Sequence, residues 1–159
     1  MSENLAKLCE MAVQTVVEQT KKIMAAPADS QVVKANQHLL DLGDFGVGAG
    51  LLSCAGALYY VLDCTLAVTG TYACAVSFNA SGFSWDFGAF TAPVAGTFLV
   101  NPNTIAGKCR FTCIAVDVGE GMATFTLFGT DGELYGTFVG LTEGGDVADI
   151  SGTGTLSVS

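Results

Sequence analysis

Hydrophobic residues recur at helical spacing near the beginning of the chain. One face of the expected helix would carry Leu5, Cys9, Ala12, Val16 and Ile23. Ser2 can cap the start of this helix, and Pro27 ends it because proline lacks the backbone N–H that a helix interior needs. The pattern predicts an amphipathic helix over residues 3–25 and a shorter helical segment over residues 29–42.

From Gly43 onward the pattern changes to alternation, which is typical of β-strands that bury one face. In the first clear example the apolar positions are Tyr60, Leu62, Cys64, Leu66 and Val68. Further strands are predicted in TYACAVSFN, GFSWDFGAF, GTFLV, KCRFTCIAV, MATFTLF, ELYGTFV and GTLSV. Glycine, asparagine and aspartate turns separate these segments.

Roughly eight short strands without helical crossovers predict an all-β fold, an antiparallel eight-stranded barrel or a sandwich. Residues 1–42 would form an N-terminal amphipathic helix and linker, and residues 43–159 the β domain. The aromatic residues expected in its core are Phe78, Phe83, Trp85, Phe87, Phe90, Phe98, Phe111, Phe125 and Phe138. Whether a barrel interior would be filled or hollow stays open, because eight strands can hold either side chains or one small ligand.

The segment FTLFGTDGELYGTFVG is typical of a β-hairpin. Asp131-Gly132 is a tight-turn pair, since glycine adopts positive φ without strain. Asp131 and Glu133 flank this turn, and we expect them to have no histidine, metal-ligand cluster or basic partner. We therefore expect a structural hairpin rather than an acid–base site.

Charge is distributed unevenly along the 159 residues, whose formal net charge is −9. From Ala35 onward the only cations are Lys108 and Arg110, whereas eleven acidic residues lie in the same part of the chain. Nucleic-acid binding requires cations that neutralise phosphates, so this composition excludes a nucleic-acid partner. An anionic membrane surface would be repelled for the same reason.

The six cysteines allow either three disulfides or reduced side chains in the core. The first residues lack the pattern of a signal peptide, so we expect reduced cysteines and a cytoplasmic protein or one exported by a non-classical route. Cys109 and Cys113 are spaced too widely for a C-x-x-C motif, and His38 is the only histidine. No metal site and no cofactor are expected.

The segment GDFGVGAGLLSCAGALYYVLD contains 18 consecutive residues without charge, between Asp44 and Asp63. Such a segment can insert into a membrane, but its second half alternates, which favours a strand, a turn near Gly56 and a second strand. Together with the helix, it supplies the candidate membrane or partner contacts. These are Phe45, Gly46, Gly50, Leu51, Leu52, Leu5 and Val16.

Catalytic residues are not indicated. His38 lies in the segment between helix and β domain, and no G-x-S-x-G motif is present. Asp63 and Asp86 each interrupt an aromatic strand. On the outer face they would oppose aggregation, whereas on the inner face they would be polar groups in a cavity.

The C-terminal third, ATFTLFGTDGELYGTFVG followed by SGTGTLSVS, resembles the virulence-associated Vap proteins of actinobacteria. This resemblance implies a compact eight-stranded β-barrel after a variable N-terminal region, no obvious catalytic site and action on host endolysosomal membranes. The six cysteines, the N-terminal helix and a closing strand with fewer glycines depart from that family's pattern. No functional residue is carried over.

The sequence thus favours a non-catalytic binding protein, effector-like in action. It would contact a protein partner or membrane through the helix and the Gly-rich segment, and the helix would also serve for self-association. One alternative is a carrier that holds a small apolar ligand or lipid in the barrel. Another is an enzyme that uses Asp or Glu.

Overall fold

The computed structural model describes residues 3–40, 45–83, 90–116, 121–142 and 148–159. The helical elements are α1 (Glu3–Met24), α2 (Gln31–Ala35), η1 (Gln37–Leu40) and η2 (Pro102–Thr104). The strands are β1 (Val47–Ala57), β2 (Tyr59–Val68), β3 (Cys74–Phe83), β4 (Phe90–Phe98), β5 (Gly107–Val116), β6 (Met122–Phe128), β7 (Leu134–Leu141) and β8 (Ala148–Val158).

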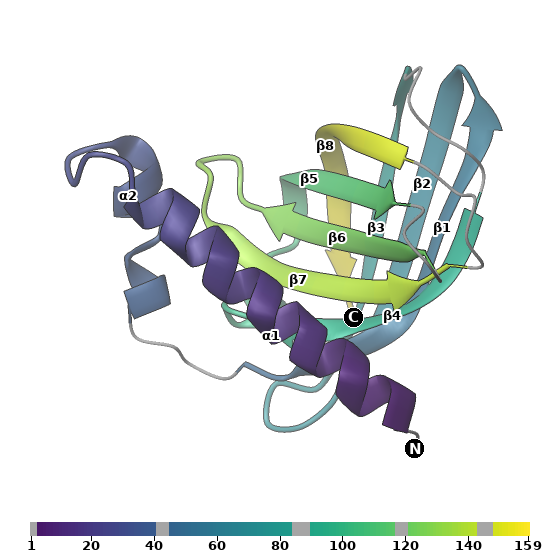
Figure 1. The fold of residues 1–159 in the computed structure, drawn as a ribbon, viewed down its shortest axis with the longest axis horizontal. Helices are drawn as coiled ribbons and strands as arrows, with labels where there is room; N and C mark the ends of the chain where they lie inside the picture. The colour runs from purple at the N-terminus through teal and green to yellow at the C-terminus, as the bar shows by residue number, and fades with distance from the viewer. Residues whose placement is uncertain (1–2, 41–44, 84–89, 117–120, 143–147) are drawn as a thin grey trace.

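The eight strands form a closed antiparallel barrel in the order β1-β2-β3-β8-β5-β6-β7-β4 (Figure 1). The predicted barrel behind an N-terminal helix is therefore confirmed, and the sandwich alternative is not. The C-terminal strand β8 closes the barrel because it pairs with β3 on one side and with β5 on the other.

The Gly-rich segment folds as two strands, β1 and β2, joined at Leu58. Leu58 has a φ of 68°, the only positive φ of a non-glycine residue in the described part of the chain. A turn was predicted near Gly56, two residues earlier. The alternating residues of β2, from Tyr60 to Val68, are all buried, as predicted from their spacing.

Aromatic rings fill the barrel interior. Neighbouring rings of this cluster have centroids 4.9 to 6.5 Å apart. The predicted core residues that are buried are Phe78, Phe90, Phe98, Phe111, Phe125 and Phe138. An eight-stranded barrel is just wide enough for side chains to fill, and here they do so.

The prediction for Phe83 was wrong, because this side chain is 82% exposed. The sequence pattern assigned it to a separate strand, whereas it is the last residue of β3. On β3 the inward positions are Val76, Phe78 and Ala80, so alternation turns Phe83 outward. Trp85, Asp86 and Phe87 lie outside the described residues.

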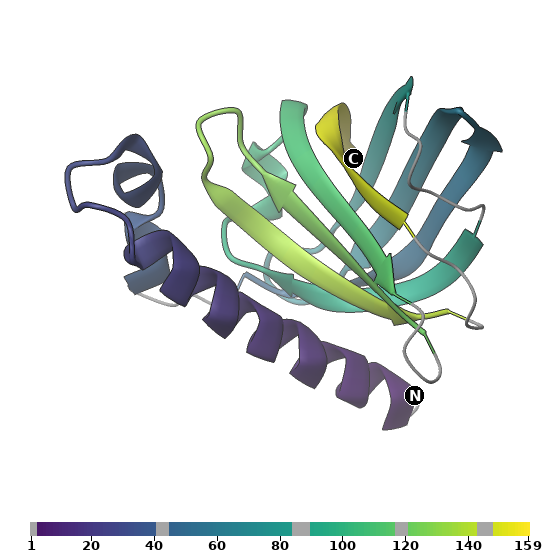
Figure 2. The same ribbon diagram turned by 45° about the horizontal axis from the view of Figure 1, so that its top comes forward.

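Helix α1 lies along the outer face of the barrel over β4 and β7 (Figures 1 and 2). Its predicted amphipathic face packs there, with Leu8 and Ala12 against Ala95 and Val139. Val16 packs against Leu99 and Leu134 of the same face. None of the described helices has the length and hydrophobicity needed to cross a bilayer.

Candidate binding groove on the outer face of the barrel

A groove of about 620 Å³ lies on the outer face of β2, β3, β8 and β5. Its size is in the range of sites that bind drug-sized molecules. The polar side chains that line it are Tyr59, Asp63, Asn79, Ser81, Lys108, Thr130, Thr153 and Thr155. Val61, Ala80 and Gly154 complete the lining. We call this concavity the outer groove.

The strand register places four of these residues in one row across the sheet. Asp63 is paired with Asn79, Asn79 with Thr155, and Thr155 with Lys108. Asn79 donates its side-chain amide to an Asp63 carboxylate oxygen, which orients both groups. The row therefore begins with a negative charge on β2, continues through an amide and a hydroxyl, and ends with a positive charge on β5.

The groove lies where β3 and β8 separate. Their pairing runs from Val76 and Val158 to Ala80 and Gly154, and the following residues of β3, from Ser81 to Phe83, have no β8 partner. Tyr60 occupies the interior at this point. An added Cβ would lie 3.1 Å from its hydroxyl oxygen at Gly82 and 3.2 Å at Gly152, so these glycines make room for the ring.

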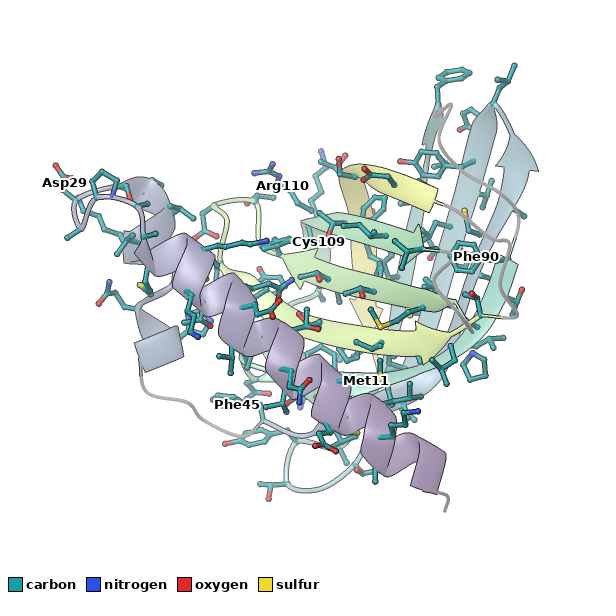
Figure 3. The ribbon with its side chains drawn as sticks, in the orientation of Figure 1. Met11, Asp29, Phe45, Phe90, Cys109 and Arg110 are labelled. Atoms are coloured by element: carbon teal, nitrogen blue, oxygen red, sulfur yellow. The ribbon has the colours of Figure 1, made fainter. Side chains whose placement is uncertain are left out.

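A second concavity of about 490 Å³ adjoins the outer groove and shares Thr153 with it. Arg110, Thr112 and Ser151 line it together with Ile23 of α1. Arg110 points away from the barrel wall (Figure 3), while the alternating neighbour Cys109 is buried. Lys108 and Arg110 thus project from the same outward face of β5, one toward each concavity.

Apolar side chains gather at the free end of β1, β2 and β3, beside the outer groove. Leu58 is 54% exposed at the connection between β1 and β2. The rings of Tyr59 and Phe83 are in edge contact, with centroids 5.1 Å apart, and Val61 is also exposed. The Tyr59 hydroxyl donates to the Ser81 hydroxyl at 3.1 Å. We call Leu58, Tyr59, Val61 and Phe83 the apolar end.

The contact residues proposed from the Gly-rich segment do not form one surface. Leu51 is 47% exposed on the outer face, but Leu52 is buried in the core. Phe45 packs on that core and on the Tyr72 ring, at a centroid distance of 5.1 Å. Gly50 has a structural role, because an added Cβ would lie 1.7 Å from the Thr65 carbonyl oxygen.

Two of the remaining proposed contacts, Gly46 and Val16, have structural roles. Gly46 adopts a φ of 113° just before β1, a conformation that favours glycine. Val16 of α1 is buried against the barrel, so the barrel itself occupies the helix face that was expected to contact a partner. The side chain of Leu5 lies outside the described residues. Val16 and Leu52 are therefore unavailable to a partner in this arrangement.

The β6–β7 hairpin was predicted correctly, with Gly132 at a φ of 93°. The Gly129 N–H donates to the Glu133 carbonyl at 2.7 Å. The Asp131 carboxylate accepts from the Glu133 N–H at 3.0 Å, within the turn. The acidic residues of this turn therefore serve the hairpin geometry.

The expectation that these acids have no histidine partner was wrong. His38 Nδ1 lies 3.8 Å from a Glu133 carboxylate oxygen, and His38 Nε2 donates to the Leu134 carbonyl at 2.9 Å. The buried side chain of Asn36 donates to the Gly132 carbonyl at 2.9 Å and accepts from the Leu134 N–H at 2.7 Å. Nothing in the sequence links these residues, which are almost a hundred positions apart.

Burial dominates the acidity of groups in and around the core. It raises the pKa of Glu133, an effect that His38 opposes and Asp131 reinforces. It also raises the pKa of Cys54 and Cys109 to about 11 and that of Cys113 to about 12. All six cysteines are free thiols, and four of them are buried, as expected for core residues. Such thiols are poor nucleophiles because the thiolate is suppressed.

The outer groove was missed at the level of sequence, although Asp63 was identified as unusual. Asp63 faces outward, which excludes a role inside a cavity of the barrel. Among the described residues, no group of three or more His, Cys, Asp or Glu side chains is placed to hold a metal ion. No protein-family model and no curated protein matches the chain. The resemblance to the Vap proteins stays a prediction.

Proposed function

We propose that this protein is a non-catalytic binding protein and that its ligand is a hydroxyl-rich molecule, a saccharide, held in the outer groove. The observation that carries this proposal is the row Asp63, Asn79, Thr155 and Lys108 along a groove of about 620 Å³. Its carboxylate, amide, hydroxyl and ammonium groups donate and accept hydrogen bonds, as sugar hydroxyls require.

The flanks of the groove suit the same ligand. Tyr59 lines the groove, and Phe83 supports its ring from the side. An aromatic ring presents a flat apolar face to the C–H groups of a sugar, while its hydroxyl stays among polar groups. The barrel interior, in contrast, is filled by aromatic rings and offers no support for the apolar-carrier alternative.

The proposal can be tested on a glycan array with the full chain and two matched variants. Thr155→Gln places a larger neutral side chain in the middle of the groove. Ser157→Gln places the same side chain on the same strand and the same outward face, but outside the groove lining. We expect wild type and Ser157→Gln to bind the same oligosaccharides and Thr155→Gln to lose them. If wild type binds none, or if both variants bind alike, the proposal is refuted.

The apolar end favours a second function, contact with a protein partner or a membrane. Exposed apolar clusters commonly mark such contacts. Leu58 belongs to the uncharged segment from which this function was expected, and Phe83 adds the most exposed of the large hydrophobic side chains described. Because the chain is acidic overall, a zwitterionic surface is the suitable membrane probe.

Co-sedimentation with phosphatidylcholine vesicles tests the membrane form of this second function. The variant Phe83→Ser should reduce the bound fraction, whereas Val13→Ser, on the exposed side of α1, should not. The partner form predicts that wild type captures a defined protein from cross-linked cells and that Phe83→Ser does not. Absence of both vesicle binding and capture would contradict this function.

A further inference from the structure

The two cations of the barrel are concentrated at one place. Lys108 and Arg110 are the only lysine and arginine from Ala35 onward, and both project from the outward face of β5. They alternate with the buried residues Cys109 and Phe111, so the strand geometry holds both on the same side. Figure 3 shows the Arg110 side chain extending into the open.

Neither cation has a partner within the part of the chain that the structure describes. The one ion pair there joins His38 to Glu133, and the side chains of Lys108 and Arg110 make no hydrogen bond in it. The acid in the outer groove is Asp63, three strands away from Lys108, which corresponds to roughly 14 Å at the usual strand spacing. Asp63 is bonded to Asn79 rather than to either cation.

Hydroxyl groups lie beside both cations. Thr155 is the cross-strand partner of Lys108, and Thr153 is the partner of Arg110. Thr153 also lines both concavities, so it stands at their junction. A guanidinium, an ammonium and two hydroxyls offer the donors that an oxyanion accepts, and the guanidinium can bind two of its oxygens at once.

Resting on the proposed function, we infer that the ligand is an acidic saccharide and that Lys108 and Arg110 bind its anionic group. This group is an oxyanion, either carboxylate, sulfate or phosphate. It lies at the β5 end of the outer groove, and the neutral hydroxyls of the ligand extend along Thr155 and Asn79 toward Asp63. The separation of charge along the row gives the bound ligand one orientation, since its anion is repelled at the Asp63 end.

Oligosaccharides in matched neutral, carboxylated and sulfated forms test this inference, with affinities measured by calorimetry on the full chain. We expect the acidic forms to bind more tightly than their neutral counterparts. Lys108→Ala and Arg110→Ala should each weaken acidic binding by about tenfold or more, the usual effect of losing a charge-assisted hydrogen bond. Neutral binding should weaken by less than acidic binding, because each variant then loses only contacts to uncharged hydroxyls.

Lys7→Ala is the matched control, because it removes one positive charge from the exposed surface of α1 and Lys7 lines neither concavity. It should leave the ratio of acidic to neutral affinity unchanged. Raising the salt concentration should reduce that ratio for wild type, since screening weakens exposed charge pairs.

The possible failures are distinguishable. Equal affinity for acidic and neutral forms, or an unchanged ratio in both β5 variants, would overturn the anion site and leave saccharide binding intact. No binding to any form would overturn the proposed function itself. If Lys7→Ala lost as much affinity for the acidic oligosaccharides as Lys108→Ala and Arg110→Ala, the effect would be one of net charge, and the anion site would also be overturned.

Discussion

The barrel has two contrasting outer faces. Over β4 and β7 the outward residues are apolar or buried, among them Ala95, Val139 and Leu134, and α1 covers them. Among the described residues, α1 packs mainly on β4 and β7 rather than on β2, β3, β8 and β5, and the outward residues of the groove are mainly polar. The same alternation thus yields a docking face for the chain's own helix on one side and an open polar face on the other.

Polar residues on the two faces differ in how they are satisfied. Thr126 and Thr137 are buried beneath α1, where Gln19 donates to Thr126 at 3.0 Å and accepts from Thr137 at 2.8 Å. On the open face Thr153 and Thr155 are exposed, and their hydroxyls are accessible to a ligand. Covered polar groups need partners within the protein, whereas exposed ones bind water or a ligand.

The largest effect is expected when the covered face receives a charge. Ala12→Asp places a carboxylate at a position that is 0% exposed, between α1 and the barrel. The free energy of unfolding should fall by about 3 kcal/mol, because the charge has no partner there. Val13→Asp, at a helix position that is 51% exposed, should have little effect. Equal urea midpoints for the two variants would contradict the docking of α1.

A second substitution tests the contact between the helical connection and the β6–β7 hairpin. Asn36→Ala removes the side chain that bonds to Val32, Gly132 and Leu134. We expect a loss of about 2 to 3 kcal/mol in urea unfolding, since buried backbone groups are left unsatisfied. Gln37→Ala is the control, because this exposed neighbour bonds only to the preceding turn. Similar losses for both variants would show that the hairpin contact is unimportant.

A smaller effect is expected at the polar pair beneath the helix. Gln19→Ala leaves Thr126 and Thr137 without their shared partner and should cost about 1 to 2 kcal/mol. Gln14→Ala, on the exposed side of α1, should cost much less. Adding Thr126→Val and Thr137→Val to Gln19→Leu should restore stability, because all the polar groups are then removed together. Failure of this triple variant to recover would argue against the Gln19 interaction.

The smallest effect concerns pH. Burial raises the pKa of Glu133 in the folded state, so folding favours its protonated form. The stability due to this shift is fully present below the unfolded pKa, roughly 4.3, and is lost as the pH rises through the folded value. Relative to Glu133→Gln, wild type should therefore lose stability over that pH range.

Two charged neighbours act on the pKa of Glu133: His38 lowers it and Asp131 raises it. Measurements of unfolding by urea at several pH values, with Asp149→Asn as an exposed acidic control, isolate the contribution of Glu133. A constant difference between wild type and Glu133→Gln across the range would contradict the raised pKa.

Local patterns in the sequence determined most of the secondary structure. Helix α1 was predicted to within a residue of its end, because its apolar spacing and Pro27 are both local signals. The inward faces of β2, β5 and β6 follow from strict alternation, and Asp131-Gly132 marks the hairpin after β6. Phe83 was misplaced because its inward or outward direction depends on the strand to which it belongs.

The tertiary structure alone decided how these elements meet. It placed β8 between β3 and β5, which aligned Asp63, Asn79, Thr155 and Lys108 in one row. It also packed the apolar face of α1 on the barrel rather than leaving it for a partner. The physical reason is that alternation is a local property, with the same period in every strand. Which strands pair, and in which register, depends on the packing of the whole barrel.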